Sequence, residues 1–232
     1  MRVRQTDRVT SQWEQRLTAA LDQALAVADG LADQRVAAIR RARPELSPRQ
    51  VIGVLEREFA GLTVVTGAGT GMVAAVPAVG LVAALGLAGA DLVAFLTASA
   101  AHALAVARVH GQDYRSVERQ RALVLAVLIG NAGSKVVLNT VGRTGVRWGR
   151  SLAATLPLRL VKELNRRLGG LLLKKFGPKA GLVSAVKTIP LGLGAAIGGT
   201  GNFVMGREVI HSTREAFGAP PEVFTGSGPE QH

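Results

Sequence analysis

The chain begins with apolar residues at helical spacing and continues into a long stretch with almost no polar positions. In the first part this spacing is carried by four apolar side chains, Trp13, Leu17, Leu21 and Leu25. They follow a capping-box pattern that starts at Ser11, and this combination predicts a helix. We expect that helix to end at Gly30.

Two more amphipathic helices are predicted before residue 60. The first runs from about Leu31 to Arg43 and stops at Pro44, because proline cannot continue a helix. The second begins at Ser47 and Pro48, which suit the N-cap and the first helical position. The pattern after Phe59 leaves open whether residues 62–66 continue this helix or form a short strand.

Residues 59–107 form the most apolar stretch, and Asp91 is its only formally charged residue. A surface helix has a polar face, which this stretch lacks, so we expect it to be buried in a protein core or in lipid. Small residues recur at four-residue steps and a proline permits a break, which favours a helical hairpin with small-residue faces. The positions concerned are Gly67, Gly71, Pro77 and Gly80.

Asp91 is a carboxylate in an apolar setting and therefore needs a partner. We expect it to begin or interrupt a helix that ends near Val109, with His102 close to the same face. A backbone N–H, His102 or an arginine from elsewhere would satisfy the carboxylate. We interpret Asp91 as a helix cap or a buried structural ion pair rather than as a proton or ion site.

A dinucleotide-binding fingerprint is an alternative interpretation of the same stretch. Gly69, Gly71 and Ala74 match G-x-G-x-x-A, and Asp91 lies 20 residues after Gly71. Pro77, however, falls where the phosphate-binding helix should run, and no alternation of strands and helices follows. We therefore favour the hairpin.

A second Gly-rich apolar block, residues 188–206, parallels the first and indicates an internal duplication. Pro190 corresponds to Pro77, and Asn202 corresponds to Asp91. The sequence thus predicts an all-α fold, a multi-helix bundle with Gly/Ala-rich apolar helical hairpins. Its expected parts are an amphipathic N-terminal region (1–58), a helical core (59–217) and a disordered Pro/Gly-rich tail (218–232).

Charge is distributed very unevenly along this chain of net charge +12. Residues 1–58 hold 10 Arg against 8 acidic residues, whereas residues 135–187 hold 12 Lys/Arg against Glu163 alone. Within the basic segment, residues 158–176 have the pattern of a basic amphipathic helix, which is typical of membrane surfaces or acidic partners. The predicted anionic-lipid-binding residues are Arg143, Arg147, Arg150, Lys162, Arg166, Arg167, Lys174 and Lys175.

Several function classes are disfavoured by what the sequence lacks. The chain has no cysteine, which excludes disulfides, thiolate metal sites and cysteine nucleophiles. Its four histidines are scattered, no nucleophile–base pattern occurs, and Glu208, His211 and Glu215 offer only a three-residue metal edge. We therefore expect no enzyme activity, no cofactor and no metal, and the charged N-terminus predicts no secretory signal peptide.

Taken together, these features resemble the EcsC family over about residues 45–220. The resemblance rests on the Gly-rich block with Pro77 and Asp91, on the turn at His110, and on the second block with Pro190 and Asn202. His110 stands where the family usually has Tyr. The family takes its name from a protein encoded beside an ABC transporter. The resemblance therefore implies a bacterial, membrane-linked setting with a membrane transporter as a partner, and no particular reaction.

Three hypotheses follow. The leading one is a non-enzymatic, membrane-associated helical protein on the inner face of the cell membrane, with anionic phospholipid as its partner. The alternative is a soluble helical enzyme or binding protein for a phosphate-bearing or lipid-like ligand. Nucleic-acid binding is the least favoured, because aromatic residues make up only 4% of the chain and base stacking needs them.

Overall fold

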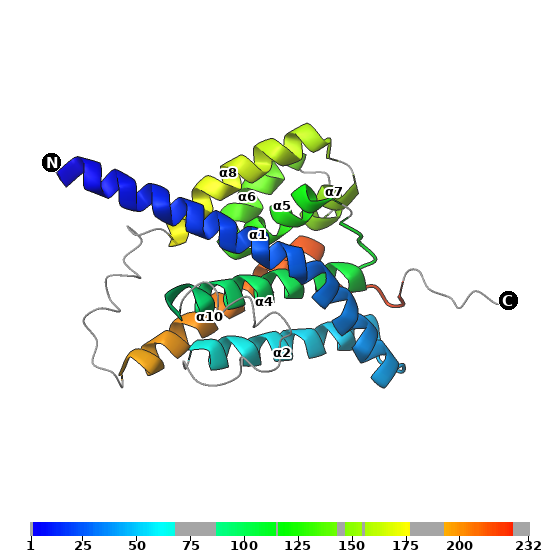
Figure 1. Cartoon of the computed structure of the whole chain (residues 1–232). Coiled ribbons are helices and arrows are strands. Elements are labelled where there is room, and N and C mark those ends of the chain that lie inside the picture. The colour runs from blue at the N-terminus through cyan, green and yellow to red at the C-terminus, as the bar shows by residue number, and fades with distance from the viewer. Residues whose placement is uncertain are drawn as a thin grey trace.

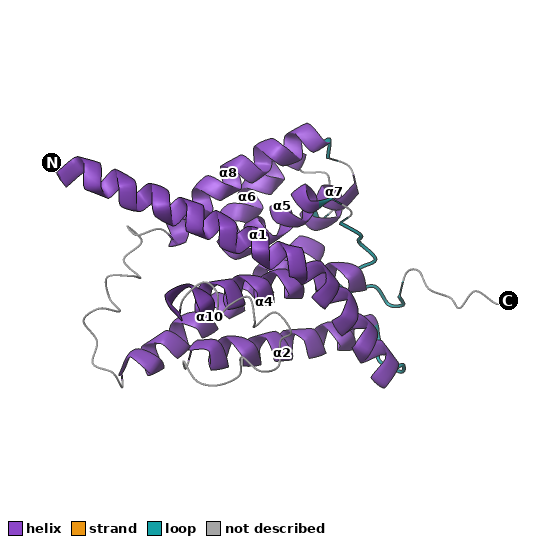
Figure 2. Cartoon of the chain, viewed as in Figure 1, coloured by secondary structure: helices purple, strands orange, loops and turns teal. Residues whose placement is uncertain are grey.

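The protein is a bundle of helices in a computed structural model that describes residues 2–67, 87–114, 116–142, 147–154, 156–176 and 193–224. Within these ranges all regular secondary structure is α-helical, which confirms the predicted all-α fold (Figure 2). The helices are α1 (Arg2–Ala42), α2 (Pro48–Gly67), α4 (Leu87–Val109), α5 (Val117–Ile129), α6 (Asn131–Val141), α7 (Trp148–Ala154), α8 (Leu158–Phe176) and α10 (Leu193–Phe217).

Helix α4 lies at the centre of the bundle and packs against α1, α2, α5 and α10 (Figure 1). Small side chains such as Ala100, Ala103 and Ala107 are fully buried along it and let the neighbouring helices come close. Among the described residues, Leu92–Val109 is the one helical stretch long and apolar enough to cross a membrane, and 72% of it is buried inside the bundle. The apolar character of α4 is therefore used in packing.

The predicted helix end at Gly30 is wrong, because α1 continues past this residue. The helix runs through this residue without interruption to Ala42 and ends before Pro44, as predicted. An apolar stripe continues across Gly30, with Leu25, Ala28 and Ala32 buried against the core. Packing of this stripe on α4 outweighs the cost of one helical glycine, which is about 1 kcal/mol.

The predicted start of α2 is confirmed in detail. The Ser47 backbone N–H donates to Gln50 Oε1 at 2.8 Å, and the Gln50 N–H donates to Ser47 Oγ at 3.4 Å, which together form a capping box. Residues 62–66 continue the helix. Near its end α2 touches α10 so closely that a Cβ added at Gly206 would lie 2.7 Å from Thr63 Oγ1, so this crossing requires a glycine.

Helices α5 to α8 form the upper part of the bundle in Figure 1. Helix α5 is buried along most of its length and contacts α6, α7 and α8. Ser116 is its N-cap and accepts a hydrogen bond from the Arg119 N–H. Gly130, at φ +81°, separates α5 from α6, and the two helices meet at Gly133, where a Cβ would clash with the Ala126 backbone.

Ion pairs join the helices around α4 and use the acidic residues of the first 58 positions. Arg108, at the end of α4, contacts Asp29 at 2.6 Å and Asp33 at 2.7 Å on α1. Partial burial alone would lower the pKa of Arg108, but its hydrogen bond to Asp33 and the nearby carboxylates raise it above its ordinary value. Similar links join Arg121 to Asp22, Arg35 to Glu58 and Arg214 to Glu56. The acidic charge of α1 and α2 is thus largely paired.

Some of the predicted turn positions fall outside the described residues: Gly71, Pro77, Gly80 and Pro190. Gly67 is the last residue of α2. Asp91 lies in α4, which begins four residues earlier at Leu87, and Asn202 lies in α10; for these two only the backbone is described. Of the predicted tail, residues 218–224 are described. The Arg40 guanidinium carbon lies over the Phe224 ring, 4.3 Å from the centre of that ring.

Candidate anionic-lipid interface

Helix α8 is the central element of the predicted lipid-binding segment, and its bounds agree with the predicted 158–176. The Pro157 carbonyl accepts the first helical hydrogen bonds, from the N–H groups of Leu160 at 2.9 Å and Val161 at 3.2 Å. One face of the helix is buried against α5 and α6, and its buried residues are Val161, Leu164, Leu168 and Leu172. This apolar face is core, so the helix cannot lay it on a membrane without leaving the bundle.

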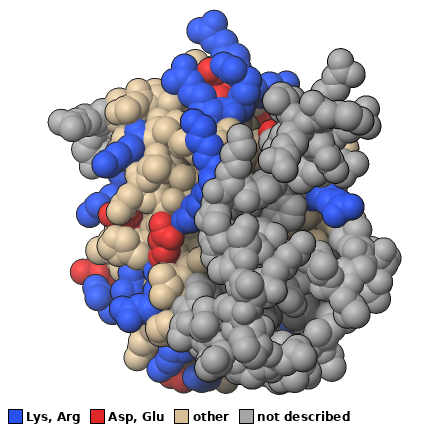
Figure 3. Space-filling model, turned by 90° about the vertical axis from the view of Figure 1, so that its left-hand side faces the viewer, with Lys and Arg blue, Asp and Glu red and all other residues tan. Residues whose placement is uncertain are grey.

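The opposite face of α8 is exposed and strongly basic. Figure 3 shows Lys and Arg side chains gathered at the top of the molecule, where α8 lies in Figure 1. The exposed basic residues of α8 are Arg159, Lys162, Arg166, Arg167 and Lys174, and we call this surface the α8 basic face. Glu163 is the only acidic residue in the helix. The face therefore presents a net positive charge to solvent.

Glu163 pairs with two arginines of the α8 basic face. Its carboxylate accepts hydrogen bonds from Arg166 at 2.7 and 2.9 Å and from Arg167 at 2.8 Å. The hydrogen bonds from Arg166 and then Arg167 lower the pKa of Glu163 to about 2, so it stays ionised at neutral pH. One carboxylate shared by two guanidiniums leaves excess positive charge, and in the described part of the chain Lys162 and Lys174 have no carboxylate partner.

Two leucines are exposed at the start of α8, beside this charge. The side chain of Leu158 is 45% exposed and that of Leu160 is 36% exposed, and Arg159 lies between them in the sequence. Exposed apolar side chains next to basic ones suit a surface that offers both phosphate groups and shallow apolar contact. The sequence prediction did not single out Leu158, Arg159 or Leu160.

Lys175 has a different position from its neighbour Lys174. Its ammonium group donates to the carbonyls of Leu128 at 3.0 Å and Ile129 at 3.3 Å, which are the last residues of α5. It also pairs with Glu208 of α10 at 2.7 Å. Lys175 thus caps the C-terminal end of α5, where unpaired carbonyls favour a cation, and ties α8 and α10 to it.

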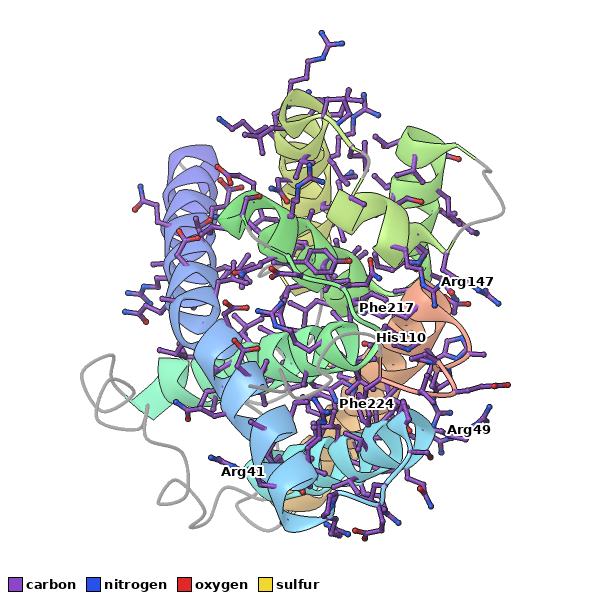
Figure 4. The ribbon with its side chains drawn as sticks, turned by 90° about the vertical axis from the view of Figure 1, so that its right-hand side faces the viewer. Arg41, Arg49, His110, Arg147, Phe217 and Phe224 are labelled. Carbon is purple, nitrogen blue, oxygen red and sulfur yellow. The ribbon has the colours of Figure 1, made fainter. Side chains whose placement is uncertain are left out.

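Arg147 and Arg150 lie near the end of α10, apart from the α8 basic face. Arg147 packs over Gly218, and both His110 and Phe217 are close to it in Figure 4. The rings of His110 and Phe217 are stacked with centroids 5.2 Å apart. Burial, and secondarily the charge of Arg150, lower the pKa of His110 to about 4. Arg143 falls outside the described residues.

His102 forms a similar stack within the core. Its ring lies on Phe59 with centroids 4.7 Å apart, and in the described part of the chain neither imidazole nitrogen has a hydrogen-bond partner of good geometry. Burial is the main cause that lowers its pKa to about 4. Both buried histidines are therefore neutral aromatic packing groups at pH 7.

The residues of the α8 basic face are exposed on the surface of the bundle. Two open grooves in the described structure are lined by residues of other elements. Within the described ranges no group of three or more His, Asp or Glu side chains is arranged to hold a metal ion. The chemistry available at α8 is the binding of anions at a surface.

Comparison with models of known protein families, with curated protein sequences and with solved structures found no match. The resemblance to the EcsC family therefore stays a prediction from the residue pattern.

Proposed function

We propose that this chain is a non-enzymatic helical protein that binds anionic phospholipid on the inner face of the cell membrane. The observation that carries the proposal is the α8 basic face: a row of exposed cations on a helix whose apolar side is already buried. Binding is electrostatic, with Leu158 and Leu160 adding shallow apolar contact.

The expected strength follows from the number of exposed cations. Each Lys or Arg near an anionic membrane contributes about 1 kcal/mol. Arg159, Lys162 and Lys174 are exposed, and in the described part of the chain none has a carboxylate partner, so together they contribute about 3 kcal/mol. Arg166 and Arg167 share Glu163 and contribute less than two separate charges would.

A membrane partner accounts for the surface better than nucleic acid does. Among the described side chains of α8, none is aromatic, so a base has no ring there on which to stack. The resemblance to the EcsC family adds a membrane-linked setting and an accessory role beside a transport or secretion system. The alternative, a soluble protein that binds a phosphate-bearing or lipid-like ligand at its Gly-rich turns, concerns residues mostly outside the described ranges.

The test is co-sedimentation of the purified full chain with vesicles of phosphatidylcholine alone and with increasing phosphatidylserine. Wild type is compared with a Lys162→Gln/Lys174→Gln variant and with a control that loses two exposed charges elsewhere, Arg16→Gln/Arg41→Gln. Removing two charges from α8 should weaken binding to anionic vesicles by about 30-fold, which corresponds to about 2 kcal/mol.

The control should bind much more strongly than the α8 variant, and none of the three proteins should bind pure phosphatidylcholine. Equal weakening by both variants would mean that net charge, not the α8 basic face, determines binding. A duplex DNA of mixed sequence serves as the competing partner. Tighter binding to DNA than to anionic vesicles at equal salt would reject the lipid proposal.

A further inference from the structure

An open groove of about 500 Å³ lies where the end of α1 meets the start of α2. The residues that line it include apolar Leu46, Gly53 and Val54 and polar Arg43, Gln50 and Arg57. A volume of this size falls in the range that small ligands occupy in proteins, about 300–1,000 Å³. The groove is far from the α8 basic face, at the lower end of the bundle in Figure 1.

Two arginines at this groove have no carboxylate partner among the described residues. Arg35 is bound by Glu58, and Arg40 lies over the Phe224 ring. Arg43 and Arg57 are exposed. Within the described ranges neither guanidinium pairs with a carboxylate or caps a helix end. Two guanidiniums that line one groove without a counter-ion mark a place where an anion would be stabilised.

The start of α2 adds donors to the same groove. Gln50 lines it, and its side-chain oxygen is already used by Ser47, so its amide N–H groups are the part left to donate. The positive end of the α2 dipole lies at Pro48, one turn away, and Arg49 is exposed there (Figure 4). These features favour an anion, and the planar guanidiniums match the oxygens of a phosphate group.

The geometry points to a binding site for a phosphate monoester with a small apolar body. Arg43 and Arg57 take the phosphate, Gln50 donates to one of its oxygens, and the apolar body lies along Leu46 and Val54. Gly53 has open space beside it, since a Cβ added there would meet nothing within 4 Å. This site does not depend on the α8 basic face. The phosphate can come from a soluble compound or from the headgroup of a lipid.

The experiment measures binding of phenyl phosphate to the full chain by isothermal titration calorimetry, with phenol as the uncharged comparison. An Arg43→Gln/Arg57→Gln variant removes the guanidiniums, and Gly53→Leu fills the groove without a steric clash at Cβ. The matched controls are Arg41→Gln, an exposed charge that does not line the groove, and Gly61→Leu, another α2 glycine with open space around it.

We expect both groove variants to weaken binding by about tenfold or more, because hydrogen bonds to a charged group are lost or blocked. Both controls should bind as wild type does, phenol should not bind, and no variant should unfold below the wild-type temperature. Equal affinity of the groove variants and wild type, or equal loss in the controls, would overturn the site for soluble phosphate monoesters.

Vesicles that contain phosphatidic acid test the second source of phosphate. Vesicle binding that depends on Arg43, Arg57 and Gly53, and that survives in Lys162→Gln/Lys174→Gln, supports a lipid headgroup as the ligand even if phenyl phosphate does not bind. The site is rejected if the groove variants bind both phenyl phosphate and the vesicles as wild type does. If vesicle binding is lost only in the Lys162→Gln/Lys174→Gln variant, the groove site is rejected and the proposed function is supported.

Discussion

Lys174 and Lys175 are adjacent in the sequence, but the same substitution is expected to affect a different property at each: stability at Lys175 and vesicle binding at Lys174. Lys175→Met removes three hydrogen bonds of the ammonium group, two to the last carbonyls of α5 and one to Glu208, while keeping the length of the side chain. Hydrogen bonds to charged groups are worth about 1.5–3 kcal/mol when buried. The side chains of Lys175 and Glu208 are 28% and 40% exposed, so solvent screening reduces this figure.

We therefore expect Lys175→Met to lower the free energy of unfolding by about 1–2 kcal/mol. In a chain of this size that loss corresponds to a fall of about 3–6 °C in Tm. Lys174→Met removes an exposed charge and should change stability by less than about 0.5 kcal/mol. It should instead weaken binding to anionic vesicles about fivefold, the equivalent of one membrane-facing charge.

The assay is thermal unfolding followed by circular dichroism, with vesicle co-sedimentation of the same two variants. The reasoning is refuted if Lys175→Met unfolds at the wild-type temperature and loses vesicle affinity as much as Lys174→Met does. That result would place Lys175 among the membrane-facing residues, and the α5 cap would have no measurable role.

Three further outcomes are expected. Burial lowers the pKa of His102 to about 4, so between about pH 6.5 and pH 4 the unfolded chain binds a proton that the folded chain does not. The free energy of unfolding should therefore fall by about 2–3 kcal/mol for this group as the pH drops through that range. Urea unfolding of His102→Leu should show a flatter pH dependence than wild type. Gly133→Ala should cost about 1–3 kcal/mol in chemical denaturation because the new Cβ meets the α5 backbone, whereas Gly170→Ala, which meets nothing, should be neutral or slightly stabilising. Tyr114→Phe should cost about 1–2 kcal/mol in the same assay, because the buried hydroxyl donates to the Gly149 carbonyl at 2.5 Å; an unchanged midpoint would mean that water replaces the bond.

The all-helical fold and several helix ends could be predicted because they depend on local physical rules. Pro44, Ser47 and Pro48 act on their immediate neighbours, so the sequence alone indicates what they do. Gly30 shows the limit of such rules. A glycine suggests a helix end, but the packing of α1 along α4 is a long-range effect that local pattern does not contain.

The candidate site was only partly predictable for the same reason. The bounds and polarity of α8 follow from its periodicity, as does the exposure of Lys162, Arg166 and Lys174. Periodicity could not show that the apolar face of α8 packs on α5 rather than on lipid. Nor could it show that Lys175 reaches the end of α5, because that contact depends on how three helices meet.

The most direct test of the central claim is fractionation of cells that express the full chain, with the membranes washed first in high salt and then in alkaline carbonate. At about 1 M salt the Debye length is about 3 Å, so an attachment made by exposed cations should be lost. We expect the protein in the membrane fraction at low salt and its release by the salt wash. Its absence from the membranes at low salt, or its retention through both washes, would contradict electrostatic attachment through the α8 basic face.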